Sequence, residues 1–272
     1  MRWPGSRTDD DSKTNRSDTW NGPGELGDWR NIFAEPQTLI SSVALTVASI
    51  AALRLYKMYL RRIPGVDYIK PHQFRRKGFF GQVTSVGDAD NFRLYHTPGG
   101  RIAGWGWLPW KKVPAKRDKL RDQTLHVRLA GVDAPELAHW GRDAQPFSKE
   151  AHEWLINFIA NRRVRAYIYR RDQYDRVVAQ VFVRKRLFRQ DVGLEMIKAG
   201  LATVYEAKTG AEFGTSEEKY RAAEEKAKAQ GVGMWSKPTL LQRLSGGSTK
   251  APESPRAYKA RHAAADKQKK AV

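Results

Sequence analysis

The sequence predicts an α+β protein in which a small antiparallel β-barrel carries helices and is preceded by one apolar helix. Segments of alternating polarity, separated by Gly and Asn, occupy the first part of the domain, and helical periodicity is mixed in later. The chain has 272 residues and is 40% hydrophobic, with nine Trp and ten Phe, which is enough for a buried core. An uncharged run, residues 39–53, lies ahead of this domain.

Five segments of different composition divide the chain. We expect a disordered acidic arm, an apolar helix, a basic linker, a folded domain and a disordered basic tail, at residues 1–36, 37–60, 61–77, 78–240 and 241–272 respectively.

Residues 37–60 are predicted to form a single membrane-spanning helix. The run LISSVALTVASIAAL is apolar on every side, whereas a helix on the surface of a soluble domain has a polar stripe. Tyr56 and Tyr59 lie where interfacial aromatic residues belong, and a basic collar surrounds them: Arg54, Lys57, Arg61 and Arg62. The run is shorter than the ~20 residues of an ideal span, so a buried core helix or a signal-peptide core is an alternative.

The charges on either side of the apolar helix bear on that alternative and on orientation. An acidic arm precedes the run, whereas a signal peptide begins with basic residues. The bases that follow the run predict that the folded domain lies on the cytoplasmic or matrix side of the membrane.

The strands are expected in the first two thirds of the folded domain. Gly78 opens it, and the alternation from Phe79 to Leu94 predicts a hairpin. A long insertion, residues 96–123, follows and contains three Trp together with Gly and Pro, which predicts a structured loop. Three more strands are predicted, at residues 124–132, 164–170 and 177–184.

Three helices are expected after the insertion. Apolar residues recur at helical spacing on one face of residues 147–159, and residues 191–199 form a second helix. The third helix is predicted to begin at a capping box of Thr215 and Glu218 and to end at Gly231.

The composition narrows the function to a few classes. The chain carries 49 Lys and Arg against 29 Asp and Glu, a formal charge of +20, which suits nucleic acid or an anionic membrane surface as a partner. It has no Cys, which excludes a disulfide scaffold, a thiolate nucleophile and Cys-ligated zinc or iron–sulfur sites. The six His show no metal-ligand spacing, which argues against a zinc hydrolase or a ββα-metal nuclease.

Two charged clusters could bind a metal ion and a phosphate together. Asp88 and Asp90 are two apart in a segment expected to be extended, so that both carboxylates would face one cation, although a polar turn is the alternative. The sequence RLAGVDAPE then brings Arg128, Asp133 and Glu136 within nine residues at the end of a predicted strand. These three could hold a phosphate, a metal and a water, or could be a surface salt-bridge group.

A third cluster, Asp172-Gln173-Tyr174-Asp175-Arg176, forms a predicted polar turn between two strands. It offers one more guanidinium for a phosphate, although Arg176 taken by itself is consistent with a solvated surface residue.

Together these clusters resemble the staphylococcal nuclease (thermonuclease) family. The segments that carry the resemblance are GDADNF (87–92), VRLAGVDAPE (127–136), DQYDRVVAQVFV (172–183), MIKAGLATVY (196–205) and EEKAKAQGVGMWS (224–236). The resemblance implies an OB-type five-stranded barrel with three helices. The arm, the apolar helix and the insertion resemble one branch in particular, the fungal single-pass membrane endonucleases of mitochondria.

The resemblance implies roles for six residues. One carbonyl and two carboxylates match the calcium ligands: Ala134, Asp90 and Asp133. Two guanidinium groups match the arginines that bind phosphate, those of Arg128 and Arg176, and Glu136 matches the residue assigned as general base.

The activity implied is calcium-dependent endonuclease cleavage of DNA or RNA, single-stranded or frayed, that leaves 5′-hydroxyl and 3′-phosphate ends. Two positions depart from the family pattern. Asn91 stands where many members have Thr, which could change the support of Asp90, and Asp175 stands where Gly is common, which could weaken phosphate affinity. Stacking on bases is predicted for aromatic residues of the turn and the insertion, as is packing within the insertion: Tyr174, Tyr205, Trp105, Trp107 and Trp110.

The alternative function is a catalytically silent domain of the same fold, tethered to a membrane, that binds nucleic acid or protein. The acidic and Arg residues that such domains lose are present here, which favours the enzyme.

Overall fold

The computed structural model describes residues 36–138, 143–206, 212–213, 216–236, 255, 257–258 and 261. The predicted arm up to residue 35, most of the predicted tail, and Thr215 of the predicted capping box lie outside the described residues. The chain divides into two compact units, Met1–Leu55 and Tyr56–Val272.

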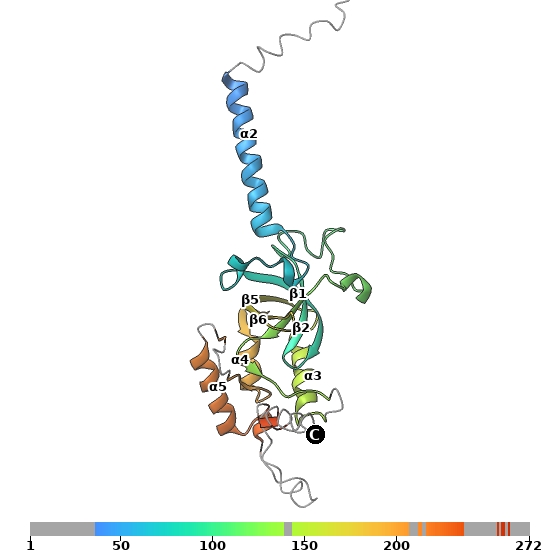
Figure 1. The fold of residues 1–272 in the computed structure, drawn as a ribbon, viewed down its shortest axis with the longest axis vertical. Helices are drawn as coiled ribbons and strands as arrows, with labels where there is room; N and C mark the ends of the chain where they lie inside the picture. Colours follow the sequence, from blue (N-terminus) through green and yellow to red (C-terminus); the bar gives the residue numbers. More distant parts are fainter. Residues whose placement is uncertain are drawn as a thin grey trace, which may run out of the picture. The chain divides into compact units, whose positions relative to one another are not determined.

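The first unit contains helix α2, Pro36–Leu55, the long blue helix of Figure 1. The helix continues as a π-helical turn, η1, Tyr56–Leu60, so that helical structure covers 25 residues, of which the most apolar 18 have a mean hydropathy of 1.8. At 1.5 Å per residue this is about 37 Å, enough to cross a hydrocarbon layer of about 30 Å. None of α2 is buried within the protein. The predicted apolar helix is confirmed, and its insertion in a membrane stays a prediction.

The second unit is built on a six-stranded sheet that closes into a barrel (Figure 1). Its strands are β1 Gly78–Asp88, β2 Asn91–His96, β3 Leu125–Leu129, β5 Arg163–Arg171, β6 Val177–Lys185 and β7 Phe188–Asp191. The order is β3-β2-β1-β5-β6-β7, and β3 also pairs with β6 in parallel, so five strands close on themselves. The five-stranded barrel is therefore confirmed.

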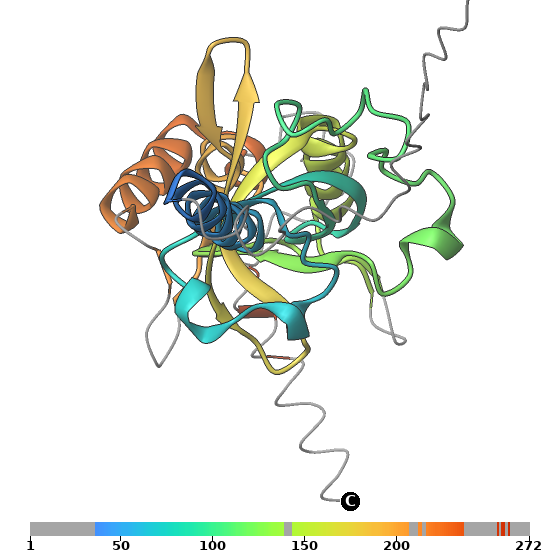
Figure 2. The same ribbon diagram turned by 90° about the horizontal axis from the view of Figure 1, so that it is seen from above.

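Three short strands were not predicted from the sequence. Strand β7 pairs with β6 in a hairpin that projects from the barrel (Figure 2). Strand β4, Val132–Asp133, pairs with β8, Thr203–Val204, in a separate two-stranded sheet.

Three helices pack on the barrel, as predicted: α3 Ser148–Ile159, α4 Val192–Lys198 and α5 Glu217–Gln230. Helix α3 buries Ala151, Leu155 and Ile159, which recur at spacings of four on one face. Helix α5 ends at Gly231, whose φ of +64° is a left-handed conformation that glycine adopts without strain. The described structure also contains four short 3₁₀ turns: η2 Val66–Tyr68, η3 Pro71–Gln73, η4 Arg117–Leu120 and η5 Gly233–Trp235.

Asp191 fastens two of these helices to the barrel. Its buried carboxylate caps α4 by accepting hydrogen bonds from the N–H groups of Gly193 and Leu194. It also accepts hydrogen bonds from Gln180 of β6, at 2.6 Å, and from the Tyr220 hydroxyl of α5, at 2.9 Å. This network fixes the helical side of the domain against strand β6.

Candidate active site

The site is organised by the parallel pair that closes the barrel. Arg128 on β3 pairs with Val178 on β6, and Arg176 lies two residues before Val178. Arg176 directly precedes β6, which begins at Val177. The closure of the barrel therefore brings together two arginines that are 48 positions apart in the sequence.

Each arginine is oriented by one carboxylate through its Nε atom. Arg128 Nε lies 3.1 Å from Asp90 Oδ2, and Arg176 Nε donates a 2.7 Å hydrogen bond to Asp172 Oδ2. Among the described residues, the ion pairs of both guanidinium groups run through Nε, so Nη1 and Nη2 remain available to a substrate. Two oriented guanidinium forks suit an anion with several oxygens, such as a phosphate.

An aromatic ring lies beside each arginine. The Tyr205 ring centre is 5.5 Å from Arg128 Cζ, and the Tyr174 ring centre is 5.2 Å from Arg176 Cζ. These contacts are within the range of cation–π attraction, so they add to the orientation that the carboxylates impose. A small cavity of about 40 Å³ lies beside Arg128, Tyr205 and Asp172.

Asp90 lies in a turn, which corrects the extended geometry expected for the DAD segment. Asp88 ends β1 and pairs with Asn91 at the start of β2, so Asp90 is the second residue of a two-residue hairpin turn. The Asp90 carbonyl accepts a hydrogen bond from Leu129 N, which ties this turn to the strand of Arg128. Of the expected pair, Asp90 is the carboxylate that contacts Arg128.

Asn91 supports Asp90 from the second strand of that hairpin. The Asn91 side chain, which is buried, donates from Nδ2 to Asp90 Oδ1 at 3.1 Å and contacts His126 Nε2 through Oδ1 at 3.2 Å. Asn91, at the position where many family members have Thr, thus links Asp90 to His126. Burial, followed by repulsion from Arg93 and Arg176, lowers the pKa of His126 to about 4, so this histidine is neutral at physiological pH.

Asp133 and Ala134 are buried at the end of the β3–β4 segment. Asp133 belongs to β4, and its carbonyl accepts a hydrogen bond from the Thr203 hydroxyl at 3.2 Å. Gly131 turns the chain between β3 and β4 at a φ of +71°, and its carbonyl accepts a hydrogen bond from Tyr205 N. Strand β8 therefore holds the backbone that carries Asp133 and positions Tyr205 together.

Glu136 follows on a half-buried loop, and two hydrogen bonds join its backbone to Gln145. Glu136 N donates to Gln145 Oε1 at 3.0 Å, and Gln145 N donates to Glu136 O at 3.0 Å. Gln145 is buried, so this reciprocal pair fixes the backbone of Glu136 against the start of α3.

Asp172 was not singled out from the sequence, although it organises the turn of Arg176. Its Oδ1 accepts from the N–H groups of Tyr174 and Arg176, at 2.8 and 2.9 Å, and its Oδ2 takes the Arg176 guanidinium. Burial alone would raise the pKa of Asp172, but the hydrogen bonds from Arg176 and Tyr174 outweigh it and lower the pKa. The signal was available as an Asp at the start of the predicted turn, four residues ahead of an Arg.

The second departure from the family pattern, Asp175, does not pair with Arg176. Its carboxylate binds Arg171, at 2.6 Å from Nη2 and 3.1 Å from Nε. Asp175 has a φ of +57°, a region that Gly occupies most easily, which accounts for the Gly common at this position. The extra carboxylate is thus engaged by a neighbouring cation.

The donor set around Asp90, Asp133 and Ala134 consists of hard oxygen atoms, which suits Ca²⁺ and excludes metals that prefer sulfur. Within the described ranges, no group of three or more His, Asp or Glu side chains is placed to hold a metal. Two carboxylates and one carbonyl fit an ion whose remaining ligands are water and substrate oxygens, because Ca²⁺ takes six to eight ligands.

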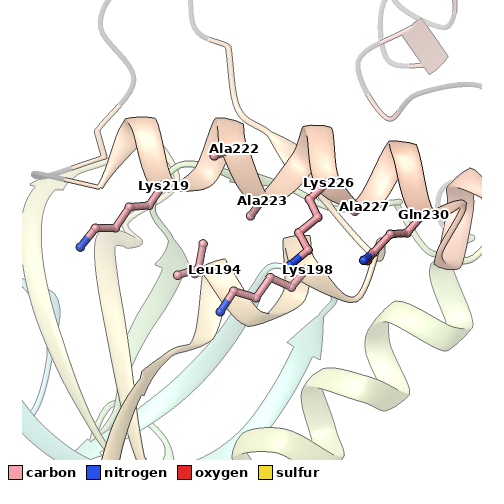
Figure 3. A pocket seen from close by; sticks show the side chains of 8 residues that line it. All are labelled: Leu194, Lys198, Lys219, Ala222, Ala223, Lys226, Ala227 and Gln230. Carbon is pink, nitrogen blue, oxygen red and sulfur yellow. The ribbon is translucent and has the colours of Figure 1, made fainter.

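A larger concavity lies elsewhere, between α4 and α5 (Figure 3). It measures about 510 Å³ and has an apolar floor that includes Leu194 and Ala223, with Lys198, Lys219 and Lys226 around it. No carboxylate is among the described residues that line it, so these residues offer no ligand for a cation and no general base. We therefore assign the site to the arginine pair despite its smaller cavity. His139, three positions after Glu136, lies outside the described residues.

A closed five-stranded barrel with three helices and an arginine pair at its parallel closure defines a staphylococcal nuclease homologue. The sequence model of that family matches residues 126–237. The chain is 71% identical over 270 residues to "Probable endonuclease lcl3" of Pyrenophora tritici-repentis (strain Pt-1C-BFP), which covers 99% of each chain. It is 66% identical over 295 residues to "Probable endonuclease LCL3" of Phaeosphaeria nodorum, covering 99% of this chain and all of that one.

A more distant relative, "Probable endonuclease lcl3" of Aspergillus niger, is 57% identical over 250 residues and covers 86% of this chain and 89% of its own. The chain therefore belongs to the staphylococcal nuclease homologue family. Membership of this family supports a nuclease that acts on nucleic acid.

Proposed function

We propose that this protein is a calcium-dependent endonuclease, anchored by residues 37–60 in a mitochondrial membrane, that hydrolyses phosphodiester bonds of DNA or RNA. Cleavage leaves a 5′-hydroxyl and a 3′-phosphate. The observation that carries the proposal is the pair of guanidinium groups, Arg128 and Arg176, each held through Nε by a carboxylate beside the parallel β3–β6 pair that closes the barrel.

The arginines bind the scissile phosphate in this proposal. Each guanidinium donates paired N–H groups to the phosphate oxygens, where negative charge increases as water attacks in line. Asp172 and Asp90 hold the two side chains in place before the substrate arrives, so little reorganisation is needed during the reaction.

Glu136 acts as general base. It takes a proton from the attacking water, the water oxygen bonds to phosphorus, and the bond from phosphorus to the 5′ oxygen breaks. The 5′ oxygen takes up a proton and leaves as a hydroxyl, and the phosphate stays on the 3′ side. Gln145 fixes the backbone of Glu136, which favours a defined position for this carboxylate.

Asp90, Asp133 and the Ala134 carbonyl would hold the calcium ion. When bound, Ca²⁺ offsets the phosphodiester charge and polarises a phosphoryl oxygen. Asp90, a proposed metal ligand, forms an ion pair with Arg128, a proposed phosphate-binding group. Because each of the two side chains positions the other, calcium and substrate are expected to bind cooperatively.

A loose preference for single-stranded or frayed nucleic acid is part of the proposal. Barrels of this type bind single strands through the phosphate backbone and through aromatic rings on which bases stack. Tyr174, which is 67% exposed beside Arg176, is the ring best placed to stack on a base next to the scissile phosphate. The net charge of +20 adds an electrostatic attraction to the phosphate backbone, and this part of the affinity weakens as the salt concentration increases.

A calcium titration tests the proposal. Full-length protein in detergent should cleave single-stranded DNA and RNA when Ca²⁺ is added, and the chelator EGTA should abolish cleavage. The product should need phosphatase treatment before a polymerase can extend it, because its 3′ end carries a phosphate. Cleavage that persists in EGTA, or products that extend directly, would refute the metal or the end chemistry respectively.

A further inference from the structure

The 96–123 insertion is a folded platform with its apolar side chains on the outside. Trp105 is buried; its Nε1 donates to Pro98 O at 3.0 Å, and its carbonyl accepts from Arg163 Nη2 of β5 at 2.8 Å. The Lys111 ammonium donates to Ala103 O at 2.8 Å, which closes the loop on itself. The insertion is thus held to the barrel by hydrogen bonds of its own.

Three large apolar residues of this platform face solvent. Ile102 is 99% exposed, Trp110 is 75% exposed and Trp107 is 60% exposed. Trp107 Nε1 already donates to Arg101 O at 2.8 Å, so its ring can enter an apolar phase without losing a hydrogen bond. Exposed Trp and Ile gathered in one loop mark an interaction surface.

The insertion is fastened to the residues that directly follow the apolar helix. A Cβ atom on Gly99 would lie 3.0 Å from Leu60 Cδ2, so the insertion packs against the last residue of the 36–60 helix. Two residues later, Arg62 donates to the Oε1 and the carbonyl of Gln123, both at 2.6 Å. Ile63 N donates to His96 Nδ1 at 2.9 Å. Both ends of the insertion therefore hold the segment at which a membrane-spanning helix would leave the bilayer.

The charge of the insertion suits anionic headgroups. Residues 96–123 contain seven Lys and Arg and two Asp, a net charge of +5. Trp is enriched at the membrane–water interface, and basic residues near it attract anionic lipids. The cleavage site is at the Asn91 end of β2, whereas the insertion begins at the His96 end, ~17 Å away at about 3.3 Å per residue. The insertion therefore begins at the end of β2 opposite the proposed cleavage site.

We propose that the 96–123 insertion is a second membrane contact, in which Ile102, Trp107 and Trp110 enter the interface of an anionic bilayer beside the spanning helix. The proposal rests on the membrane anchoring proposed above. In this arrangement the nuclease domain lies against the bilayer surface. Its proposed cleavage site is at the Asn91 end of β2, which is farther from the lipid than the His96 end.

The absence of Cys allows a direct test with single labels. Full-length variants Ile102→Cys and Trp110→Cys, each carrying an environment-sensitive fluorophore, are reconstituted in vesicles of phosphatidylcholine with phosphatidylglycerol. Glu218→Cys, at an exposed position of α5, is the matched control. Both insertion labels should be quenched by nitroxide-labelled lipid and should lose several-fold of their quenching by aqueous iodide, whereas the control label should not. Each variant should still cleave single-stranded DNA, which shows that it is folded.

Flotation of the vesicles separates this inference from the anchoring. If the chain floats with the vesicles but the Ile102 and Trp110 labels stay as open to iodide as the Glu218 label, the inference is wrong and the anchor stands. If the chain does not float, both are wrong. If an oligonucleotide, and not lipid, shields the two labels, the insertion binds nucleic acid and the proposal is overturned.

Discussion

At the scale of single residues, the two arginines of the site are built alike. Arg128 lies on β3, and Arg176 directly precedes β6, the parallel partner of β3. Each guanidinium pairs with a carboxylate through Nε and has a tyrosine ring beside it. This repeated arrangement means that a carboxylate which touches neither metal nor substrate can still decide the rate, because it positions the group that binds the phosphate.

Asp172 allows that idea to be tested. In Asp172→Asn the amide oxygen can still accept the turn N–H groups, but the charge that orients Arg176 is lost. We expect kcat to fall by roughly 10- to 100-fold, because a misplacement of about 1 Å can cost 10² in rate. The melting temperature should change little, and KM for single-stranded DNA should change less than kcat.

The matched control for this variant is Asp175→Asn. It removes another carboxylate of the same turn, one that pairs with Arg171 and not with Arg176. Its kcat should stay near that of the wild type. Equal losses in both variants would mean that the turn needs negative charge in general and that Asp172 has no special role.

At the scale of elements, the described structure shows which signals in the sequence sufficed. The β1–β2 hairpin, strands β5 and β6 and the three helices follow from alternation, periodicity and caps that are local in the sequence. The parallel contact of Arg128 with Val178 depends on the closure of the whole barrel and leaves no local signal. Strands β4 and β8 are two residues each, too short for a pattern. For Asp90 the sequence left an extended segment and a polar turn open, because the two differ there by backbone geometry alone; the structure shows the turn.

The hydrogen bond between Ile63 of the linker and His96 of β2 should make the stability of the domain sensitive to acid. His96 is buried and accepts a hydrogen bond from Ile63 N, and burial, with added repulsion from Lys77 and Arg62, lowers its pKa to about 3. Because the unfolded chain takes up this proton first, below about pH 6.5, stability should decrease as pH falls from there toward 3, by at most about 1.4 kcal/mol per pH unit.

The variant His96→Gln keeps an acceptor for Ile63 N but cannot take up the proton. Chemical denaturation of the full chain in detergent should show a shallower loss of unfolding free energy for this variant between about pH 6.5 and 4. His72→Gln, a change at an exposed position of η3, should follow the wild type. Parallel curves for wild type and His96→Gln would show that His96 does not set the acid sensitivity.

At the scale of the whole molecule, charge on either side of the apolar helix predicts its orientation. Residues 1–36 carry five basic and seven acidic side chains, whereas residues 37–62 carry four basic and no acidic ones. The basic side is expected to stay on the cytoplasmic or matrix side, together with the nuclease domain.

Protease protection of intact mitochondria measures this orientation. An epitope at the C-terminus should be lost from untreated organelles if the domain faces the cytoplasm, or only after both membranes are opened if it faces the matrix. Loss when the outer membrane alone is ruptured would place the domain between the membranes and contradict the prediction.

The central claim is that Arg128 and Arg176 form one phosphate-binding site. The most direct measurement is the rate at which the Arg128→Lys variant cleaves single-stranded DNA in saturating Ca²⁺, compared with wild type. Lysine keeps the positive charge but lacks the planar fork, so we predict a loss of about 10² in kcat, equivalent to about 3 kcal/mol. A rate near that of the wild type would show that the fork is not used and that the site does not work as proposed.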